Sequence, residues 1–138
     1  MNLFCKFVLL FVLVTSVKSS LATSESGSGF GYTTVKIFNQ MKDGSSLTVH
    51  CQSGDDDLGT HVVDVGRPYQ FRFRVNFWGT TLFSCNAYWR GKIAGFNCFD
   101  AKRDGKRCKS QCVWKGSEDG IFGYPEGSPN PDLHYAWR

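Results

Sequence analysis

The sequence predicts an all-β fold, a small antiparallel β-sandwich of about eight strands that is stabilised by disulfides. Short segments in which apolar and polar residues alternate recur about every ten residues, a spacing typical of sandwiches and barrels. Glycine or aspartate stands at nearly every corner between these segments, where the chain has to turn. No window has apolar residues at helical spacing over two turns or more. Because each segment is apolar on one face only, we expect two packed sheets, each with one solvated side.

The same alternation defines the predicted strands in order. In residues 47–52 the apolar side includes Cys51, so we expect this strand to be both packed and covalently tied. Residues 69–76 show the cleanest pattern, because every second residue from Tyr69 to Val75 is apolar and the others are polar. The predicted strands are residues 35–39, 47–52, 61–65, 69–76, 81–90, 93–100, 111–115 and 121–124.

The two ends of the chain differ from this pattern. Residues 1–22 have the charged start, short apolar run and small-residue end of a secretory signal peptide, and the run is too short to cross a bilayer, which needs about 20 residues. Residues 23–32 are rich in serine and glycine and predict a flexible N-terminal arm, followed by the sandwich domain in residues 33–124. Residues 125–138 hold three of the four prolines and predict an irregular, loosely held tail. We therefore expect a secreted, extracellular protein that does not span a membrane.

Charge and cysteine content narrow the choice of partner and compartment. The formal net charge of the full chain is +4, and it falls by two without the leader, which contains Lys6 and Lys18. So small an excess does not favour nucleic acid as a partner. Five cysteines lie outside the leader, and most of them should pair in an oxidising compartment. Since an odd number cannot pair completely, one is either a buried thiol or forms an intermolecular bond.

The sequence offers no recognisable catalytic or metal-binding pattern. His50, His61 and His134 have no zinc-ligand spacing, and Gly-x-Ser-x-Gly, P-loop and dinucleotide-binding motifs are absent. The aspartates at 55–57 lack the EF-hand spacing, so a solvated corner is the simpler interpretation. We predict no catalytic residues, no metal site and no cofactor.

Two polar loops are the candidate sites for binding a partner. Five cations in residues 102–109 form a basic loop that would attract phosphates, acidic polysaccharide or an acidic receptor loop, unless the charges serve solubility alone. The acidic corner at residues 53–58 is the second candidate. Phe77 and Trp78 at a turn, and Trp137 in the tail, should be exposed contact residues. The candidate partner-binding residues are Asp55, Asp56, Asp57, Lys102, Arg103, Lys106, Arg107 and Lys109.

Six motifs then carry a family resemblance that extends from about residue 34 to residue 124. They are Val35-x-Ile37-x-Asn39, Leu47-x-Val49-x-Cys51-x-Ser53, Asp56-Asp57-Leu58-Gly59-x-His61, Tyr69-x-Phe71-x-Phe73, Thr81-Leu82-Phe83-x-Cys85-x-x-x-Trp89, and Cys108-x-x-x-Cys112-x-Trp114 with Asp119-Gly120-Ile121. In order and spacing the chain resembles the plant self-incompatibility S1 family, the S-proteins and S-protein homologues.

The resemblance implies a small secreted β-sandwich that signals between cells by binding a plasma-membrane receptor or another cell-surface protein, and that is not an enzyme. In the family's role in self-incompatibility, binding of the secreted protein to a pollen receptor triggers calcium influx and the rejection of self-pollen. The alternative function is a secreted defence or toxin-like protein that acts on membranes through basic and aromatic loop residues.

The resemblance also distinguishes the cysteines that should form disulfides from the one that should not. The family's four cysteines match Cys51, Cys85, Cys108 and Cys112, so these should form the disulfides, whereas Cys98 is extra and should be a buried thiol in a monomer. A dimer linked through Cys98 is the alternative. Of the three possible pairings we favour Cys51 with Cys112 and Cys85 with Cys108, because bonding Cys108 to Cys112 would close a tight loop.

Overall fold

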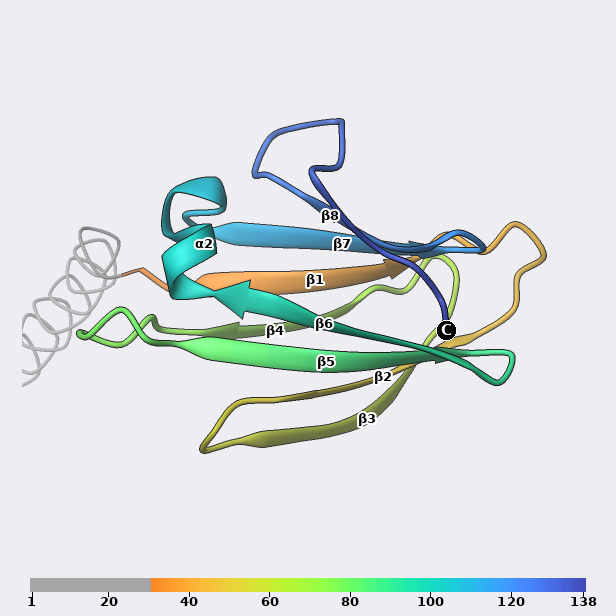
Figure 1. Ribbon diagram of the computed structural model, residues 1–138, viewed down its shortest axis with the longest axis horizontal. Coiled ribbons are helices and arrows are strands. Elements are labelled where there is room, and N and C mark those ends of the chain that lie inside the picture. Colours follow the sequence, from red (N-terminus) through yellow and green to blue (C-terminus); the bar gives the residue numbers. More distant parts are fainter. Residues whose placement is uncertain (1–30) are drawn as a thin grey trace, which may run out of the picture. The chain divides into compact units, whose positions relative to one another are not determined.

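The computed structural model describes residues 31–138 and confirms the predicted β-sandwich, in which two sheets pack face to face (Figure 1). The predicted signal peptide and most of the predicted N-terminal arm lie outside the described residues. A five-stranded sheet has the order β4-β1-β7-β8-β9, and a four-stranded sheet has the order β3-β2-β5-β6. The strands are β1 (Thr33–Asn39), β2 (Leu47–Gln52), β3 (Asp57–Val63), β4 (Tyr69–Phe73), β5 (Leu82–Trp89), β6 (Lys92–Asp100), β7 (Gln111–Ser117), β8 (Gly120–Tyr124) and β9 (Leu133–Tyr135).

One strand pair departs from the predicted antiparallel arrangement. β1 and β7 run parallel, with Val35 opposite Cys112 and Ile37 opposite Trp114, whereas the other pairs of the two sheets are antiparallel. Parallel neighbours cannot be joined by a hairpin and need a long connection. Here that connection runs from β2 to α2 and includes all four strands of the opposite sheet as well as β4, the other neighbour of β1 (Figure 1).

The segment at residues 101–107 is a helix, not the loop that we predicted. Asp100 caps the N-terminus of α2 (Ala101–Arg107) by accepting a hydrogen bond from the amide of Lys102 at 3.0 Å. Inside the helix, Asp104 is completely buried and accepts hydrogen bonds from Arg103 and Arg107. Polar capping and ion pairs, not an apolar stripe, therefore form this short helix, and hydrophobic periodicity could not reveal it.

The prediction of an irregular, loosely held tail is wrong. β9 pairs with β8 through Leu133, and the backbones of Arg138 and Ile93 exchange two hydrogen bonds. Trp137 lies 5.8 Å from the ring of Trp89 and donates its indole N–H to a backbone carbonyl, so it is half-buried and not exposed as predicted. Leu133, Tyr135 and Trp137 do alternate, but prolines earlier in the segment obscured this strand signal.

The core between the sheets is built around Trp114, which is fully buried on β7. Its ring lies 4.7 Å from that of Phe96 on the opposite sheet, and its indole N–H donates to the carbonyl of Cys98 at 3.0 Å. Gly123 on the neighbouring β8 leaves room for this ring, because a Cβ at that position would come within 2.7 Å of the indole. Trp114 therefore links the two sheets both by packing and by a hydrogen bond, within a larger core of buried apolar residues.

The disulfides join Cys51 to Cys85 and Cys108 to Cys112, so the pairing that we favoured is wrong. Cys51 and Cys85 are directly opposite each other on the adjacent strands β2 and β5, 4.0 Å apart at Cα. Cys108 and Cys112 close the short turn by which α2 leads into β7. The register of β2 against β5 places Cys51 beside Cys85, and α2, which the sequence did not predict, places Cys108 beside Cys112. The fifth cysteine, Cys98, is a buried free thiol, as predicted.

Candidate functional site

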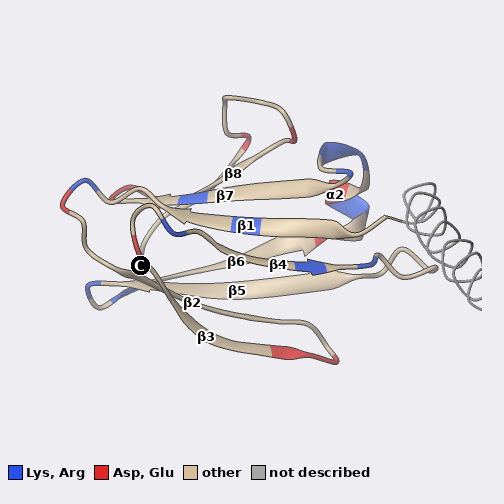
Figure 2. Ribbon diagram, turned by 180° about the vertical axis from the view of Figure 1, so that it is seen from behind, with Lys and Arg blue, Asp and Glu red and all other residues tan. Residues whose placement is uncertain are grey.

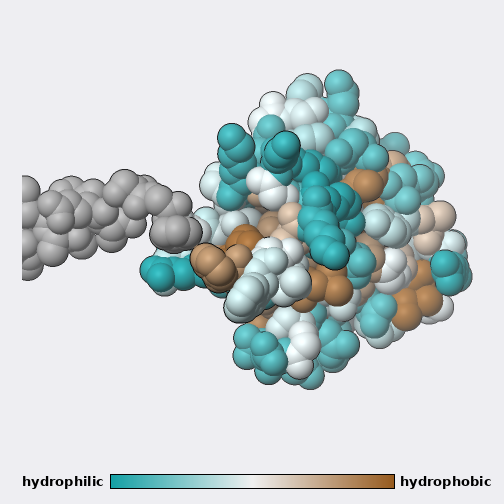
Figure 3. Space-filling model, turned by 60° about the vertical axis from the view of Figure 1, so that its left-hand side comes forward, coloured by the Kyte–Doolittle hydropathy of each residue, from teal (hydrophilic) through white to brown (hydrophobic). Residues whose placement is uncertain are grey.

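Three connecting segments gather at one end of the sandwich, the left-hand end in Figure 1, which we call the loop end. They are the β2–β3 corner (residues 53–56), the β4–β5 loop (residues 74–81) and α2. Figure 2 shows acidic residues where β3 begins and basic residues on α2 at this same end. In Figure 3, where this end comes forward, hydrophobic residues lie next to strongly hydrophilic ones. Both loops singled out from the sequence therefore lie at one end of the molecule.

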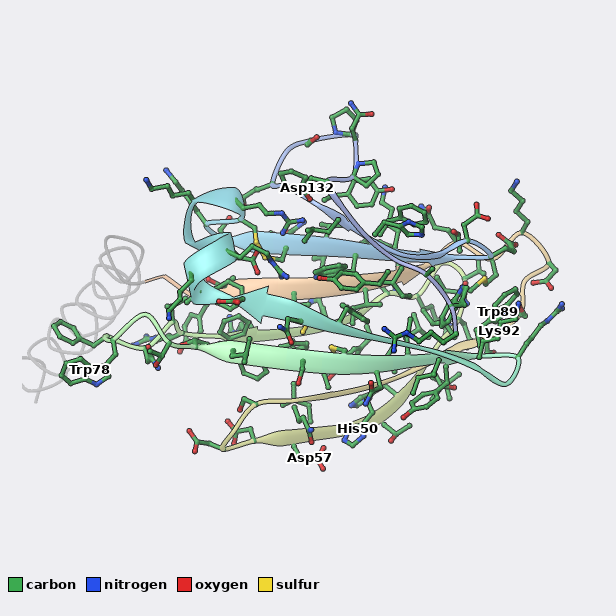
Figure 4. All side chains as sticks on the ribbon, in the orientation of Figure 1. His50, Asp57, Trp78, Trp89, Lys92 and Asp132 are labelled. Carbon is green, nitrogen blue, oxygen red and sulfur yellow. A yellow bond between two sulfur atoms is a disulfide. The ribbon has the colours of Figure 1, made fainter. Side chains whose placement is uncertain are left out.

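The most exposed aromatic side chains of the described residues are at the tip of the β4–β5 loop. Phe77 is 89% exposed and Trp78 is 81% exposed, and their rings meet edge to face at 5.4 Å. Figure 4 shows Trp78 projecting away from the sandwich. These rings add nothing to the core, so folding gains no hydrophobic free energy from them, and their apolar surface stays available for a partner to bury.

The loop that presents these rings is held by hydrogen bonds of Asn76. Its amide group donates to the hydroxyl of Thr80 at 2.9 Å and accepts from the amide N–H of Thr80 at 2.9 Å. Its own backbone N–H donates to the hydroxyl of Thr81 at 2.8 Å. Gly79 completes the turn at φ 66°, a value that glycine adopts without strain. An ordered turn loses less conformational entropy when its tip binds a partner.

The acidic corner faces a groove of about 780 Å³. Asp55 and Asp56 from the β2–β3 corner line the groove, together with Arg74 and Asn76 from the β4–β5 loop. The corner is closed by a hydrogen bond from the amide of Ser53 to the carbonyl of Asp56 at 2.8 Å. Sequence analysis missed Arg74 and Asn76, because it placed both within a strand predicted to continue to residue 76.

Asp57 is separate from the other two aspartates because it begins β3. Its carboxylate lies 2.6 Å from Nε2 of His50 and accepts the backbone N–H of Gly59 at 2.9 Å. The hydrogen bond from Gly59, and then the one with His50, lower the pKa of Asp57 below its ordinary value. Asp57 therefore points away from the groove along the outer surface of the four-stranded sheet (Figure 4).

The five predicted cations divide into two groups. Arg103 and Arg107 both bind the buried carboxylate of Asp104, at 2.8 Å and 3.0 Å, and Arg107 also binds Asp132 at 2.6 Å. The hydrogen bond from Arg107 lowers the pKa of Asp132. These two arginines thus connect α2 to the segment before β9, and their charges are compensated.

The lysines form the second group. Within residues 31–138, Lys102, Lys106 and Lys109 are exposed and make no salt bridge. Only these three of the five cations remain free to meet an acidic partner. In sequence, an aspartate flanked at −1 and +3 by arginines could have indicated which cations are internally paired.

The described histidines and the free thiol do not come together. Nε2 of each histidine is within hydrogen-bond distance of a protein oxygen: Asp57 for His50, the Leu58 carbonyl for His61 and the Asp119 carbonyl for His134. Burial raises the pKa of the Cys98 thiol, which contacts the carbonyl of Phe83. A neutral, enclosed thiol without a histidine partner is a poor nucleophile.

Two clusters in residues 31–138 have the geometry of metal ligands but not the chemistry. One contains Cys51, Cys85 and Cys98, and the other contains Asp104 with the second disulfide. Disulfide sulfur offers no thiolate, and Asp104 is already bound by two arginines. Neither cluster is therefore arranged to bind a metal. The described helix is too short and too polar to cross a membrane.

The chain is similar to known plant proteins over nearly all of its length. The family model "Plant self-incompatibility protein S1" matches residues 34–137. Self-incompatibility protein S1 of Papaver rhoeas is 38% identical, over 100% of this chain and 90% of its own length. S-protein homolog 6 of Arabidopsis thaliana is 35% identical, over 95% of this chain and 98% of its own length.

A solved structure supports the fold independently. It superimposes with a TM-score of 0.64 at 18% identity, over 80% of this chain and 97% of that chain. That structure is described as an SPH (Self-Incompatibility Protein Homologue), from "a widespread family of small, highly stable, secreted proteins from plants". The secreted localisation predicted from the sequence agrees with this description.

Proposed function

Because the chain belongs to the plant self-incompatibility protein S1 family, we propose that it is a secreted, non-enzymatic recognition ligand that binds a cell-surface protein through its loop end. Membership confirms the resemblance that the six motifs indicated. The family match extends to residue 137, beyond the predicted limit near residue 124, which agrees with the folded tail.

The exposed pair at Phe77 and Trp78 carries the proposal. Aromatic side chains dominate protein interfaces when a partner covers them, and here they stand on a turn already ordered by Asn76. Lys102 and Lys106 on α2 would form part of a charged rim that steers an acidic partner. The groove beside Asp55 and Asp56 would add polar contacts at the same end.

Binding to intact plant protoplasts tests this function. A fluorescent label on the mature protein, residues 23–138, should give saturable binding that disappears when surface proteins are removed by protease. Phe77→Ser with Trp78→Ser should weaken binding at least tenfold, which is about 1.4 kcal/mol, without a change in melting temperature. Val65→Ser, which alters an apolar residue that is 49% exposed in the β3–β4 connection, is the matched control. Undiminished binding by the aromatic variant would refute a role for the loop end.

Action on membranes is the second candidate, because exposed aromatic rings next to free lysines also suit an anionic lipid surface. Vesicles of anionic phospholipid that enclose a fluorescent dye separate the two functions. A recognition ligand should release no dye, and its binding to protoplasts should depend on surface protein. Dye release that is lost in the Phe77 and Trp78 variant would favour the membrane function.

A further inference from the structure

We propose that the outer face of the four-stranded sheet is a binding site for a neutral oligosaccharide. This face adjoins the loop end but does not include the aromatic pair Phe77 and Trp78, and the inference does not depend on the recognition function proposed above. It rests on the register of four strands, on the surface that this register creates and on the kinds of hydrogen-bonding group that the surface leaves free.

The register places outward-facing residues in rows across β3, β2, β5 and β6. One row contains His50, Asn86 and Gly95, and the next contains Gln52, Ser84 and Asn97. Strands about 4.8 Å apart, with a rise of about 3.4 Å per residue, bring the three amide side chains within roughly 10 Å of one another. That span suits one or two sugar rings.

The centre of this face is hollowed. Gly95 has no side chain to cover its neighbours, and a Cβ at that position would come within 3.1 Å of the amide oxygen of Asn86. A hollow of about 290 Å³ lies here, lined by residues from β2, β5 and β6 and, where it meets the other sheet, by Tyr135 of β9. It shares Gln52 and Ser84 with the larger groove at the loop end, so the two hollows lie side by side.

The amides of the face are free to bind a ligand. Within residues 31–138, the only hydrogen bond between side chains of the strands β2, β3, β5 and β6 joins His50 to Asp57 (Figure 4). Gln52, Asn86 and Asn97 are exposed, and their side chains make no hydrogen bond to any other residue in the described part of the chain. Each amide offers two donor hydrogens and an acceptor oxygen, which match vicinal hydroxyl groups that also both donate and accept.

The charge of the face excludes ionic ligands. Its acidic residue, Asp57, is paired with His50, and none of its outward-facing strand positions described above carries a lysine or arginine. Phosphates and uronic acids are held by cations, and the arginine that borders this surface, Arg103, which donates to the backbone carbonyl of Asn97, is already paired with Asp104. Tyr88, 40% exposed in the row beyond Asn86, supplies a ring against which the C–H groups of a sugar can lie. Free amides, a neutral surface and a flanking aromatic ring together favour an uncharged carbohydrate.

A titration followed by nuclear magnetic resonance tests the site directly, because the side-chain amide signals of Gln52, Asn86 and Asn97 report on it. The probes are hexasaccharides of β-1,4-linked glucose, xylose and mannose, with hexagalacturonate as the charged comparison. We expect saturable shifts of these amide signals with at least one neutral hexasaccharide and none with hexagalacturonate.

Substitutions provide the second arm of the test. Gln52→Ala with Asn86→Ala should lower the affinity about thirtyfold, since each of the two lost hydrogen bonds contributes roughly 1 kcal/mol. Gln70→Ala removes an exposed amide from β4 in the other sheet and should leave affinity unchanged. Phe77→Ser with Trp78→Ser should also bind normally, which separates this site from the proposed function. The inference is overturned if no neutral probe saturates, if shifts map elsewhere, or if the double amide variant binds as well as the parent.

Discussion

Asp104 and Arg107 form an ion pair that is almost entirely removed from water: the carboxylate is 0% exposed, the arginine side chain is 10% exposed, and Nη1 lies 3.0 Å from Oδ1. Asp104 also accepts the backbone N–H of Asp100 at 2.8 Å, so one buried carboxylate fixes both the start and the middle of α2. Among the cations of α2, Arg103 and Arg107 are therefore structural, and they hold in place the helix that presents the unpaired lysines.

Removing this carboxylate should therefore destabilise the whole domain. Asp104→Ala would leave Arg103 and Arg107 without their shared partner, and breaking such buried pairs typically costs about 3–5 kcal/mol. Chemical denaturation should show the loss as a lower midpoint. Lys106→Ala in the same helix is the control and should change stability by less than about 0.5 kcal/mol. Equal midpoints for the two variants would contradict a structural role for the pair.

Charge reversal at the free lysines should separate binding from stability. Lys102→Glu with Lys106→Glu should weaken protoplast binding several-fold, more at low salt than at high salt, because exposed charges act at long range. The melting temperature should stay within about 2 °C of the parent. Arg107→Glu should instead lower the melting temperature, since it places a carboxylate beside Asp104 and Asp132. Unchanged binding by the lysine variant at low salt would remove α2 from the interface.

The two disulfides should contribute unequally to stability. Cys51 and Cys85 are 34 residues apart, whereas Cys108 and Cys112 are four apart. In the loop-entropy account these loops correspond to about 4 kcal/mol and about 2 kcal/mol. Replacing each pair with alanine and comparing the free energies of unfolding should show the larger loss for Cys51 and Cys85. A larger loss for the short loop would mean that native packing, and not chain entropy, dominates.

Strand existence could be predicted from the sequence, because alternation follows directly from burial of one face. Leu47, Val49 and Cys51 alternate with polar residues, and the structure buries all three. What failed depends on contacts between distant residues. The partner of Cys51 is set by the register of β2 against β5, and β9, which begins at Leu133, is stable only because β8 lies beside it.

The candidate site was also predicted only in part, because some of its features follow from the local sequence and others depend on contacts between distant residues. Exposure of Phe77 and Trp78 followed from their position at a turn, and the structure confirms it. Which cations are free did not follow, because Arg107 is neutralised by Asp132, 25 residues away. The polar outer face of the four-stranded sheet was not predicted either. Gln52, Asn86 and Asn97 come from three different strands, and only the register of these strands brings them together.

Acid should weaken the link between α2 and the tail. Arg107 lowers the pKa of Asp132 below its ordinary 3.8, so the unfolded chain takes up the proton more readily than the folded chain. The contribution of the pair is fully present above that value and is lost as the pH falls through the lower, folded-state pKa. Denaturation midpoints measured from pH 5 to pH 2 should fall, and Asp132→Asn should start lower and fall less. Parallel pH profiles for the two proteins would show that this carboxylate does not contribute to acid sensitivity.

The thiol of Cys98 should be protected in the native protein, because it is 0% exposed and burial raises its pKa. The test uses the folded protein of residues 23–138, which lacks Cys5. A colourless disulfide reagent that releases a coloured thiolate when it reacts with a thiol should give no colour with this protein. The unfolded protein should then titrate one thiol per chain. Unfolding at neutral pH exposes this thiol and removes the effect of burial on its pKa, so its thiolate should be able to exchange with the disulfides. Cys98→Ala should therefore refold more completely after heating than the parent, and equal recovery would show that exchange does not limit refolding.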